Sequence, residues 1–284
     1  MEPTVQRWMH VQDFLDAAGD FLAVREAEHC LLFGLASVIA AHPEVYPGPR
    51  FWTVHEDGRV VAAALRTPPH NLVLSQIDES RWLAALANDV LESDDAPGAL
   101  GPTAAVNALA AAWSEHTGRS AALARRERIF RLDRVVPPRP APGHIREAEE
   151  RDRALLAEWF AAFNAEATPD NPPTDPAEHA DRFLRRAGRV AYLWDDAGET
   201  VALAGVGGLT PRGIRIGPAY TPPHLRGRGY ASNLVAAVTQ LQLDAGRSFC
   251  FLFTDLANPT SNHIYQLIGY APVVDVDQMQ FPAS

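Results

Sequence analysis

A proline-rich segment divides this sequence into two halves of similar length. Four prolines lie within Val135–Gly143. Because proline lacks a backbone N–H and favours extended chain, this segment can neither continue a helix nor lie inside a sheet. We therefore expect two domains, 1–136 and 144–284, joined by a semi-rigid linker over 137–143.

Both halves show the same expected order of elements. In the first half, a hairpin centred on Asp57-Gly58 precedes the series strand, helix, strand, helix, strand; in the second half, a hairpin centred on Ala197-Gly198 precedes the same series. Helical sequence precedes the hairpin in each half. We expect an α/β fold of the mixed-sheet (α+β) kind with a mixed, mostly antiparallel central sheet flanked by helices in each domain. We interpret the repetition as an ancient duplication.

The composition excludes several classes of function. Lys+Arg 25 against Asp+Glu 35 gives a net charge of -10, and every Lys+Arg position is arginine. An acidic surface repels phosphate backbones and anionic lipid, so we expect neither a nucleic-acid nor a membrane partner. The absence of lysine excludes a pyridoxal Schiff base and a Walker A phosphate loop.

The cysteines and the N-terminal sequence indicate the compartment. Cys30 and Cys250 lie in apolar runs, and the sequence has neither CxxC nor HExxH. We expect two buried thiols and no metal site. There is no signal-peptide pattern, and no apolar stretch approaches the roughly 18 residues of a membrane-spanning helix. These features predict a cytoplasmic protein, which we expect to be a monomer or a homodimer.

The most informative stretch is Ile214–Ala231. A β-branched run ends at Pro222-Pro223, and the sequence Arg-Gly-Arg-Gly-Tyr-Ala over 226–231 then opens into an apolar helix. Glycines allow a tight turn in which N–H groups converge at a helix N-terminus, and arginines suit phosphate, so an anion site is indicated. The alternative is an ordinary turn with two solvated arginines. The dinucleotide pattern GxGxxG is not matched.

Two motifs in the second half resemble those of the GNAT acyltransferase superfamily. Residues 226–231 are similar to its motif A, (Gln/Arg)-x-x-Gly-x-(Gly/Ala). Thr254–Tyr270 resembles its second signature, a strand followed by Asn-x-x-(Ser/Asn)-x-x-x-Tyr and Gly-(Tyr/Phe). The resemblance covers Ile145–Phe281 and is closest to the glycine-N-acyltransferase-like branch. It implies two tandem GNAT-like domains, of which the second binds acetyl-CoA.

The resemblance also implies roles for individual residues. The glycine loop would hold the pyrophosphate, the preceding strand would bind the pantetheine arm through its main chain, and Tyr265 would protonate the departing thiolate as general acid. Gly217-Pro218 interrupts that strand and favours a bulge or splay. The residues expected to bind the coenzyme are Ala219, Tyr220, Thr221, Arg226, Gly227, Arg228, Gly229, Tyr230, Ala231, Asn258, Ser261 and Asn262.

The second motif also has structural interpretations. Asn258 precedes Pro259, a pattern typical of a helix cap. Asn262 and Tyr265 follow on the same helical face, where the tyrosine could equally be a core aromatic. We expect a polar ligand beside Asn262, because an amide is hard to bury without a partner.

The general base is the least constrained part of the site. The strand Ile214–Tyr220 contains no acid. Glu166 is a possible base, and Asp170, Asp255 and His224 are the other candidates. Each also has an ordinary explanation as a solvated or turn-ordering residue, and a water chain could replace the base altogether.

These features together predict a function. The first half has no glycine turn after Gln76, so we expect it to be a degenerate GNAT-like domain without a coenzyme. We expect an N-acyltransferase that moves acetyl from acetyl-CoA to a primary amine of a small molecule or peptide. The carboxylates of the loop Glu166–Asp175 favour a cationic amine. The alternatives are an acyl-CoA-binding regulatory module without turnover and an acyltransferase that uses a longer acyl group.

Overall fold

The computed structural model describes residues 2–169, 171–172 and 174–282. The chain forms two compact units. Unit 1 comprises Met1–Ile129 and Val273–Ser284, and unit 2 comprises Phe130–Pro272. The C-terminal segment therefore packs with unit 1, whereas the sequence suggests one continuous domain over 144–284. The proline-rich segment 137–143 lies within unit 2.

The order of elements repeats along the chain. Each half contains one strand, two helices, three strands, one helix, one strand, one helix and a final strand, apart from short 3₁₀ turns. In the first half these are β1 (Thr4–Trp8), α1 (Val11–Val24), α2 (Cys30–Ala41), β2 (Arg50–Glu56), β3 (Arg59–Arg66), β4 (Leu72–Leu74), α3 (Ser80–Ser93), β5 (Gly98–Pro102), α4 (Thr103–Thr117) and β6 (Ala122–Leu132). In the second half they are β7 (His144–Glu147), α5 (Arg153–Ala167), α6 (Pro176–Leu184), β8 (Arg189–Asp196), β9 (Glu199–Gly207), β10 (Gly213–Tyr220), α7 (Tyr230–Asp244), β11 (Phe249–Asp255), α8 (Pro259–Leu267) and β12 (Ala271–Gln280).

The sheets of the two units have corresponding topologies. In unit 1 the strand order is β1-β2-β3-β4-β5-β12, with β4 parallel to β5 and the other described pairs antiparallel. In unit 2 the order is β7-β8-β9-β10-β11, with β10 parallel to β11 and the other described pairs antiparallel. The expected mixed, mostly antiparallel sheet is therefore present in both units.

The last strand completes the sheet of unit 1. β12 pairs with β5 in antiparallel register from Val276 opposite Pro102 to Gln280 opposite Gly98. Gly98 is required there, because an added Cβ would lie 2.0 Å from the Met279 carbonyl oxygen. β6 runs from unit 1 into unit 2, and its final residues Phe130 and Leu132 are buried in the core of unit 2.

Both expected hairpin turns are confirmed. Asp57 and Gly58 connect β2 to β3 with φ of 49° and 75°, and Ala197 and Gly198 connect β8 to β9 with φ of 50° and 86°. Two consecutive residues with positive φ form a turn whose twist matches that of the flanking strands. The same local conformation at corresponding places supports the interpretation of an internal repeat.

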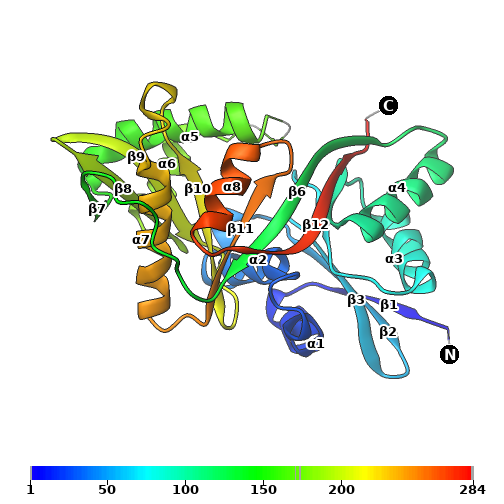
Figure 1. Ribbon diagram of the computed structural model, residues 1–284. Coiled ribbons are helices and arrows are strands. Elements are labelled where there is room, and N and C mark those ends of the chain that lie inside the picture. The colour runs from blue at the N-terminus through cyan, green and yellow to red at the C-terminus, as the bar shows by residue number, and fades with distance from the viewer. Residues whose placement is uncertain (1, 170, 173, 283–284) are drawn as a thin grey trace. The chain divides into compact units, whose positions relative to one another are not determined.

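Each unit has helices on both faces of its sheet. In unit 2, alternate residues of β9 separate two cores: Ala202 and Ala204 pack with α7, whereas Leu203 packs with α5 and α6. In unit 1, Ala62 and Ala64 of β3 likewise pack with α3 and α4, and Ala63 packs with α1 and α2 (Figure 1). Period-two alternation in a strand directs successive side chains to opposite faces. No helix among the described residues is long and apolar enough to cross a membrane.

The proline-rich segment is fixed to unit 2 by hydrogen bonds along its length. The Val136 N–H donates to the Ile268 carbonyl at 2.9 Å, and the Trp194 indole N–H donates to the Pro142 carbonyl at 2.8 Å. Between them, the Asn233 side-chain amide donates to the Arg139 carbonyl at 3.0 Å. The segment is therefore extended, as its prolines require, and packs against the surface of unit 2.

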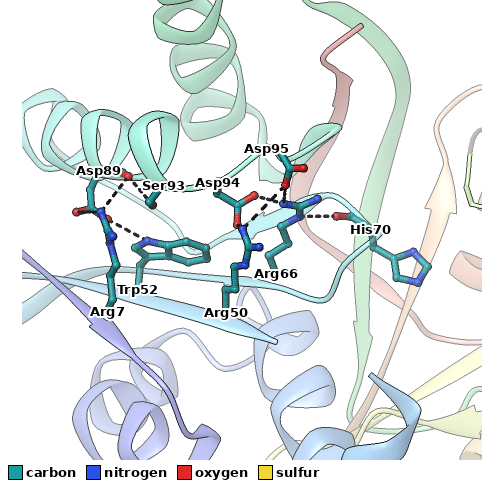
Figure 2. Close-up of polar contacts among 9 residues, drawn as sticks. All are labelled: Arg7, Arg50, Trp52, Arg66, His70, Asp89, Ser93, Asp94 and Asp95. Carbon is teal, nitrogen blue, oxygen red and sulfur yellow. Dashed lines mark hydrogen bonds and ion pairs between the residues drawn. The ribbon is translucent and has the colours of Figure 1, made fainter. Parts of the chain in front are cut away.

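A buried ionic network fixes the C-terminal end of α3 in unit 1 (Figure 2). The Asp94 carboxylate is fully buried and pairs with Arg66, whose side chain is 5% exposed, and with Arg50 at 2.8 Å. Arg66 also reaches the exposed Asp95 at 2.8 Å. One turn earlier, Asp89 accepts from the Trp52 indole at 3.0 Å. Each buried charge in the network therefore has partners. Because Arg50 lies on β2, Arg66 lies on β3 and Asp94 directly follows α3, the network joins the helix to these two strands.

Candidate functional site

The strand before the glycine loop separates from its parallel neighbour. β10 pairs with β11 only from Gly213 to Arg215, although β10 continues to Tyr220 and β11 continues to Asp255. On its other side, the register with β9 shifts between Ile216 and Ala219. The expected bulge and splay are therefore both present. They leave main-chain groups of β10 after Arg215 without partners on β11.

The end of β10 has a buried polar atom without a protein partner. The Thr221 hydroxyl is buried and has no hydrogen-bond partner among the described residues. Buried hydroxyls are nearly always paired, so this atom is the kind of group a bound ligand would satisfy. Thr221 is one of the residues expected beside the pantetheine arm.

The glycine loop leads directly into the N-terminus of α7. Gly227 and Gly229 both have left-handed backbone, with φ of 78° and 84°. The first helical hydrogen bond runs from the Asn233 N–H to the Gly229 carbonyl, and no side chain in the described part of the protein caps the helix. The N–H groups of the first turn are therefore available to an external acceptor, and the positive end of the helix dipole favours an anion there.

Backbone conformation, rather than lack of space, makes glycine necessary in this loop. An added Cβ at Gly227 would meet nothing within 4 Å, and one at Gly229 would meet only Ala141 and Asn233, at 3.5 and 3.6 Å. Residues with a Cβ rarely adopt this φ.

Side chains of the loop are positioned by the rest of unit 2. The Tyr230 ring is buried and its hydroxyl donates to the Asp196 carboxylate at 2.6 Å, so only its main chain faces the anion site. The Arg226 guanidinium pairs with Glu166 at 2.7 Å. Arg228 is exposed and donates a long hydrogen bond, of 3.4 Å, to the His224 carbonyl. Arg228 also contacts the Tyr230 hydroxyl, but unlike Arg226 it pairs with no carboxylate among the described residues.

Tyr265 lies on α8, the helix that follows β11. Its ring is half-buried and contacts Tyr270 edge-on at a centroid distance of 6.1 Å. Burial among protein atoms raises the pKa of Tyr265 to about 12. The phenol therefore keeps its proton throughout the neutral range, as a proton donor must.

The model of the family "Acetyltransferase (GNAT) family" matches residues 155–270, from α5 to the end of the second motif. Residues 155–270 form a GNAT acetyltransferase domain. This match includes the separated strands, the glycine loop and Tyr265. No curated protein matches the sequence.

Solved structures extend the GNAT fold over both halves. A Drosophila protein aligns with a TM-score of 0.69 at 16% identity, covering 99% of each chain. A tandem GNAT protein from the clavulanic acid biosynthesis pathway aligns with a TM-score of 0.59 at 14% identity, covering 100% of both chains. A GNAT-family acetyltransferase from Colwellia psychrerythraea aligns with a TM-score of 0.58 at 13% identity, covering 98% of this chain and 100% of that one. The expected tandem GNAT architecture is thus confirmed; a closer relation to the glycine-N-acyltransferase-like branch is not.

The asparagines of the second GNAT motif have protein partners. The Asn258 side chain accepts from the Ser261 N–H at 3.0 Å and caps α8, the structural interpretation given above. The Asn262 amide donates to the carbonyls of Asp255 and Asn258 at 2.8 and 2.7 Å. Because these carbonyls satisfy the Asn262 amide, its burial does not require a ligand. These residues shape the start of α8 in the GNAT domain.

The structure separates the candidate bases of the GNAT domain. Glu166 lies in the last turn of α5, rather than in the loop after it, and is engaged by Arg226. Asp255 accepts from the Ala257 N–H at 2.7 Å and orders the turn before α8. His224 is exposed. Asp170 lies outside the described residues, and among those described no group of His, Cys, Asp and Glu is arranged to hold a metal ion.

The corresponding loop of unit 1 is built differently. Between β4 and α3, no residue from Ser75 to Glu79 has positive φ. The Gln76 N–H is occupied by the His29 imidazole at 3.0 Å, and Asp78 pairs with Arg25 at 2.9 Å. Asp78 and Glu79 place carboxylates at the start of α3, whereas the corresponding helix α7 of the GNAT domain begins after Gly229. Sequence reasoning identified the missing glycines but not the interaction with His29.

Proposed function

We propose that the protein is an N-acyltransferase that moves acetyl from acetyl-CoA to a primary amine of a small molecule or peptide, using only the GNAT domain of unit 2. One observation carries the proposal: β10, which separates from its neighbour β11 after Arg215, continues through the glycine loop into the uncapped N-terminus of α7. An anionic coenzyme with a long polar arm fits this combination. The amides and Arg228 bind phosphate, and the separated strand binds the arm.

The main chain of β10 supplies hydrogen bonds to the pantetheine arm. Ala219 and Tyr220 pair with β9 on one side only, because the pairing with β11 has already ended. The Thr221 hydroxyl adds a buried group that needs a partner. Its carbonyl is different: it already accepts from the Arg226 side chain at 2.9 Å, so that carbonyl contributes to loop structure.

The chemistry requires little covalent participation by the protein. The neutral amine attacks the thioester carbonyl, a C–N bond forms, and the C–S bond breaks. The excess proton on nitrogen leaves through water, Tyr265 donates its phenolic proton to the departing thiolate, and a proton from water then restores the Tyr265 phenol. Burial raises the pKa of Tyr265 to about 12, and the same surroundings also favour protonation of a thiolate formed beside it.

The deprotonation of the amine is assigned to water rather than to a fixed carboxylate. β10 carries no acid, and Glu166 is paired with Arg226. The absence of a dedicated base also supports the second candidate function, an acyl-CoA-binding module without turnover. Release of free CoA thiol in the presence of a panel of amines separates these two functions.

Coenzyme binding is tested with a matched pair of variants at Gly229. Gly229→Glu and Gly229→Gln impose the same unfavourable φ and have side chains of the same size, but only the first adds a negative charge. A carboxylate about 5 Å from a phosphate costs about 3 kcal/mol at an effective dielectric constant of about 20. We expect Gly229→Glu to bind acetyl-CoA at least about 100-fold more weakly than Gly229→Gln in calorimetry. Equal affinities would refute the phosphate site.

The finer features of the substrate follow from charge and packing. The acidic total and the carboxylates of Glu166 and Asp175 favour a cationic amine over a carboxylate-bearing acceptor. Acetyl transfer is the simplest assignment, and an assay with longer acyl-CoA donors tests the alternative of a deeper acyl pocket. Unit 1 binds no coenzyme in this proposal, because its loop lacks the open amides.

A further inference from the structure

The side chain of Arg226, the first residue of motif A, is held against unit 2 by three contacts. Its Nε donates to the Thr221 carbonyl at 2.9 Å, and Nη2 pairs with the Glu166 carboxylate at 2.7 Å. Its guanidinium carbon also lies 5.8 Å from the centroid of the Tyr220 ring. The charge of Arg226 is therefore directed to β10 and α5. The sequence, in contrast, predicts a direct contact of Arg226 with phosphate.

Glu166 connects the same three parts of unit 2. It lies in the last turn of α5, pairs with Arg226 in the loop, and also contacts Tyr220 at the end of β10. Burial raises the pKa of the Tyr220 phenol, and the charge and hydrogen bond of Glu166 raise it further. Tyr220 in turn packs on Trp159 of α5 at a ring distance of 5.9 Å. Helix, strand and loop thus meet at one carboxylate.

The exposure of this ion pair indicates what it can contribute. The side chains of Arg226 and Glu166 are 47% and 46% exposed. Ion pairs exposed to this degree stabilise a fold little. They can still select one conformation of a short loop, since the loop Arg226–Gly229 has two glycines and few other side-chain contacts. We therefore expect the pair to affect the affinity for ligand more than the free energy of unfolding.

We propose that Glu166 and Arg226 are positioning residues. The pair holds the chain between β10 and α7 in the shape that turns the loop amides toward the coenzyme phosphates, and neither side chain touches the phosphates or the reacting atoms. This inference rests on the proposed function, because it assigns roles within the same coenzyme site. It also replaces the role of general base considered for Glu166.

The variant Glu166→Gln distinguishes three roles by the direction of its effect. If the pair positions the loop, the dissociation constant of acetyl-CoA and its KM rise about threefold to tenfold while kcat at saturation stays near the wild-type value. If Arg226 swings out to bind phosphate, removing its competing carboxylate tightens binding instead. If Glu166 is the base, kcat falls with KM unchanged. Either of the last two results, or no change at all, would overturn the inference.

A matched control lies in the short 3₁₀ turn Glu150–Asp152, directly before the same helix. Glu150→Gln removes the same charge from the pair with Arg153 at the other end of α5, where the distance is 2.7 Å. We expect it to leave acetyl-CoA affinity unchanged. Both variants should keep the melting temperature of the wild-type protein within a few degrees, which shows that a change in affinity is not a loss of fold.

A double-mutant cycle tests whether the two residues act together. We expect Glu166→Gln combined with Arg226→Gln to weaken coenzyme binding no more than Arg226→Gln alone, because the second change removes an interaction that is already lost. Arg226→Gln should also retain the salt dependence of binding, whereas Arg228→Gln should reduce it. If the fold-loss of acetyl-CoA affinity in the double variant equals the product of the two single losses, the two residues do not act as a positioning pair. Wild-type protein that binds no acetyl-CoA would refute the proposed function itself, and with it this inference.

Discussion

The buried histidine His29 predicts a loss of stability in mild acid. Its side chain is 2% exposed and lies between α1, α2 and the end of β4. The Gln76 N–H donates to Nε2 at 3.0 Å, so Nε2 must be unprotonated, and Nδ1 carries the hydrogen that is donated to the Leu22 carbonyl at 3.0 Å. Only the neutral ring satisfies both bonds, since a proton on Nε2 would face the Gln76 N–H.

The size of the effect follows from the pKa. Burial lowers the pKa of His29 from 6.5 to about 4, and the nearby Arg25 adds to this effect. Between these values the unfolded chain binds a proton that the folded protein does not, so the free energy of unfolding decreases as the pH falls from 6.5 to 4. The loss amounts to about 3 kcal/mol, which is fully restored above pH 6.5.

The assay compares the pH dependence of wild type with that of His29→Gln. The variant is destabilised at pH 7 because two buried hydrogen bonds are disturbed, but the difference between the two proteins should shrink by about 3 kcal/mol by pH 4 in urea unfolding. His179, whose pKa burial also lowers to about 4, contributes equally to both proteins and cancels. If the variant fails to fold, the NMR titration of the wild-type His29 ring decides. A ring that titrates near pH 6.5 would refute the reasoning.

Three further predictions concern the site and its support. Tyr265→Phe should retain acetyl-CoA affinity in calorimetry and lose about 10²–10⁴-fold in CoA release, because only the acidic proton is removed; wild-type turnover would make Tyr265 a packing residue. Asp94→Ala should lower the free energy of unfolding in urea by about 3–5 kcal/mol, because it leaves Arg66 buried without its main partner. Asp95→Ala, at a site 91% exposed, should lower it by less than about 1 kcal/mol. Similar losses in the two variants would contradict the buried network. Titration of the full chain should saturate at one acetyl-CoA per chain; two coenzymes per chain would show that unit 1 has a working site. In the turnover assay, cationic amines should be better acceptors than amines that carry a carboxylate.

The stoichiometry experiment has to use the whole chain. A fragment of residues 140–284 would lack Phe130 and Leu132, which are buried in the core of unit 2. It would also carry β12 without β5, its partner in unit 1. An exposed strand edge and a missing part of the core both favour misfolding. Loss of activity in such a fragment would therefore say nothing about the contribution of unit 1.

The sequence by itself determined the features that depend on neighbouring residues. The two glycines at 227 and 229 predict a tight turn before α7, Asp57-Gly58 predicts a hairpin, and Asn258 before Pro259 predicts a helix cap. The structure has all three features. The order of elements and the positions of the glycine loop and Tyr265 follow from such local rules. Each depends on the conformational range and hydrogen-bonding groups of a few adjacent residues, which the sequence states directly.

Only the tertiary structure decided which distant residues meet. The ion pair of Arg226 with Glu166 joins residues 60 positions apart, and the placement of β12 in unit 1 sets it beside β5. A strand pattern specifies which face is buried but not which edge of which sheet it joins, and a charged side chain can pair with any opposite charge within reach. For this reason the motifs of the candidate site were legible in the sequence, whereas the ion pair beside its loop became visible only in the fold.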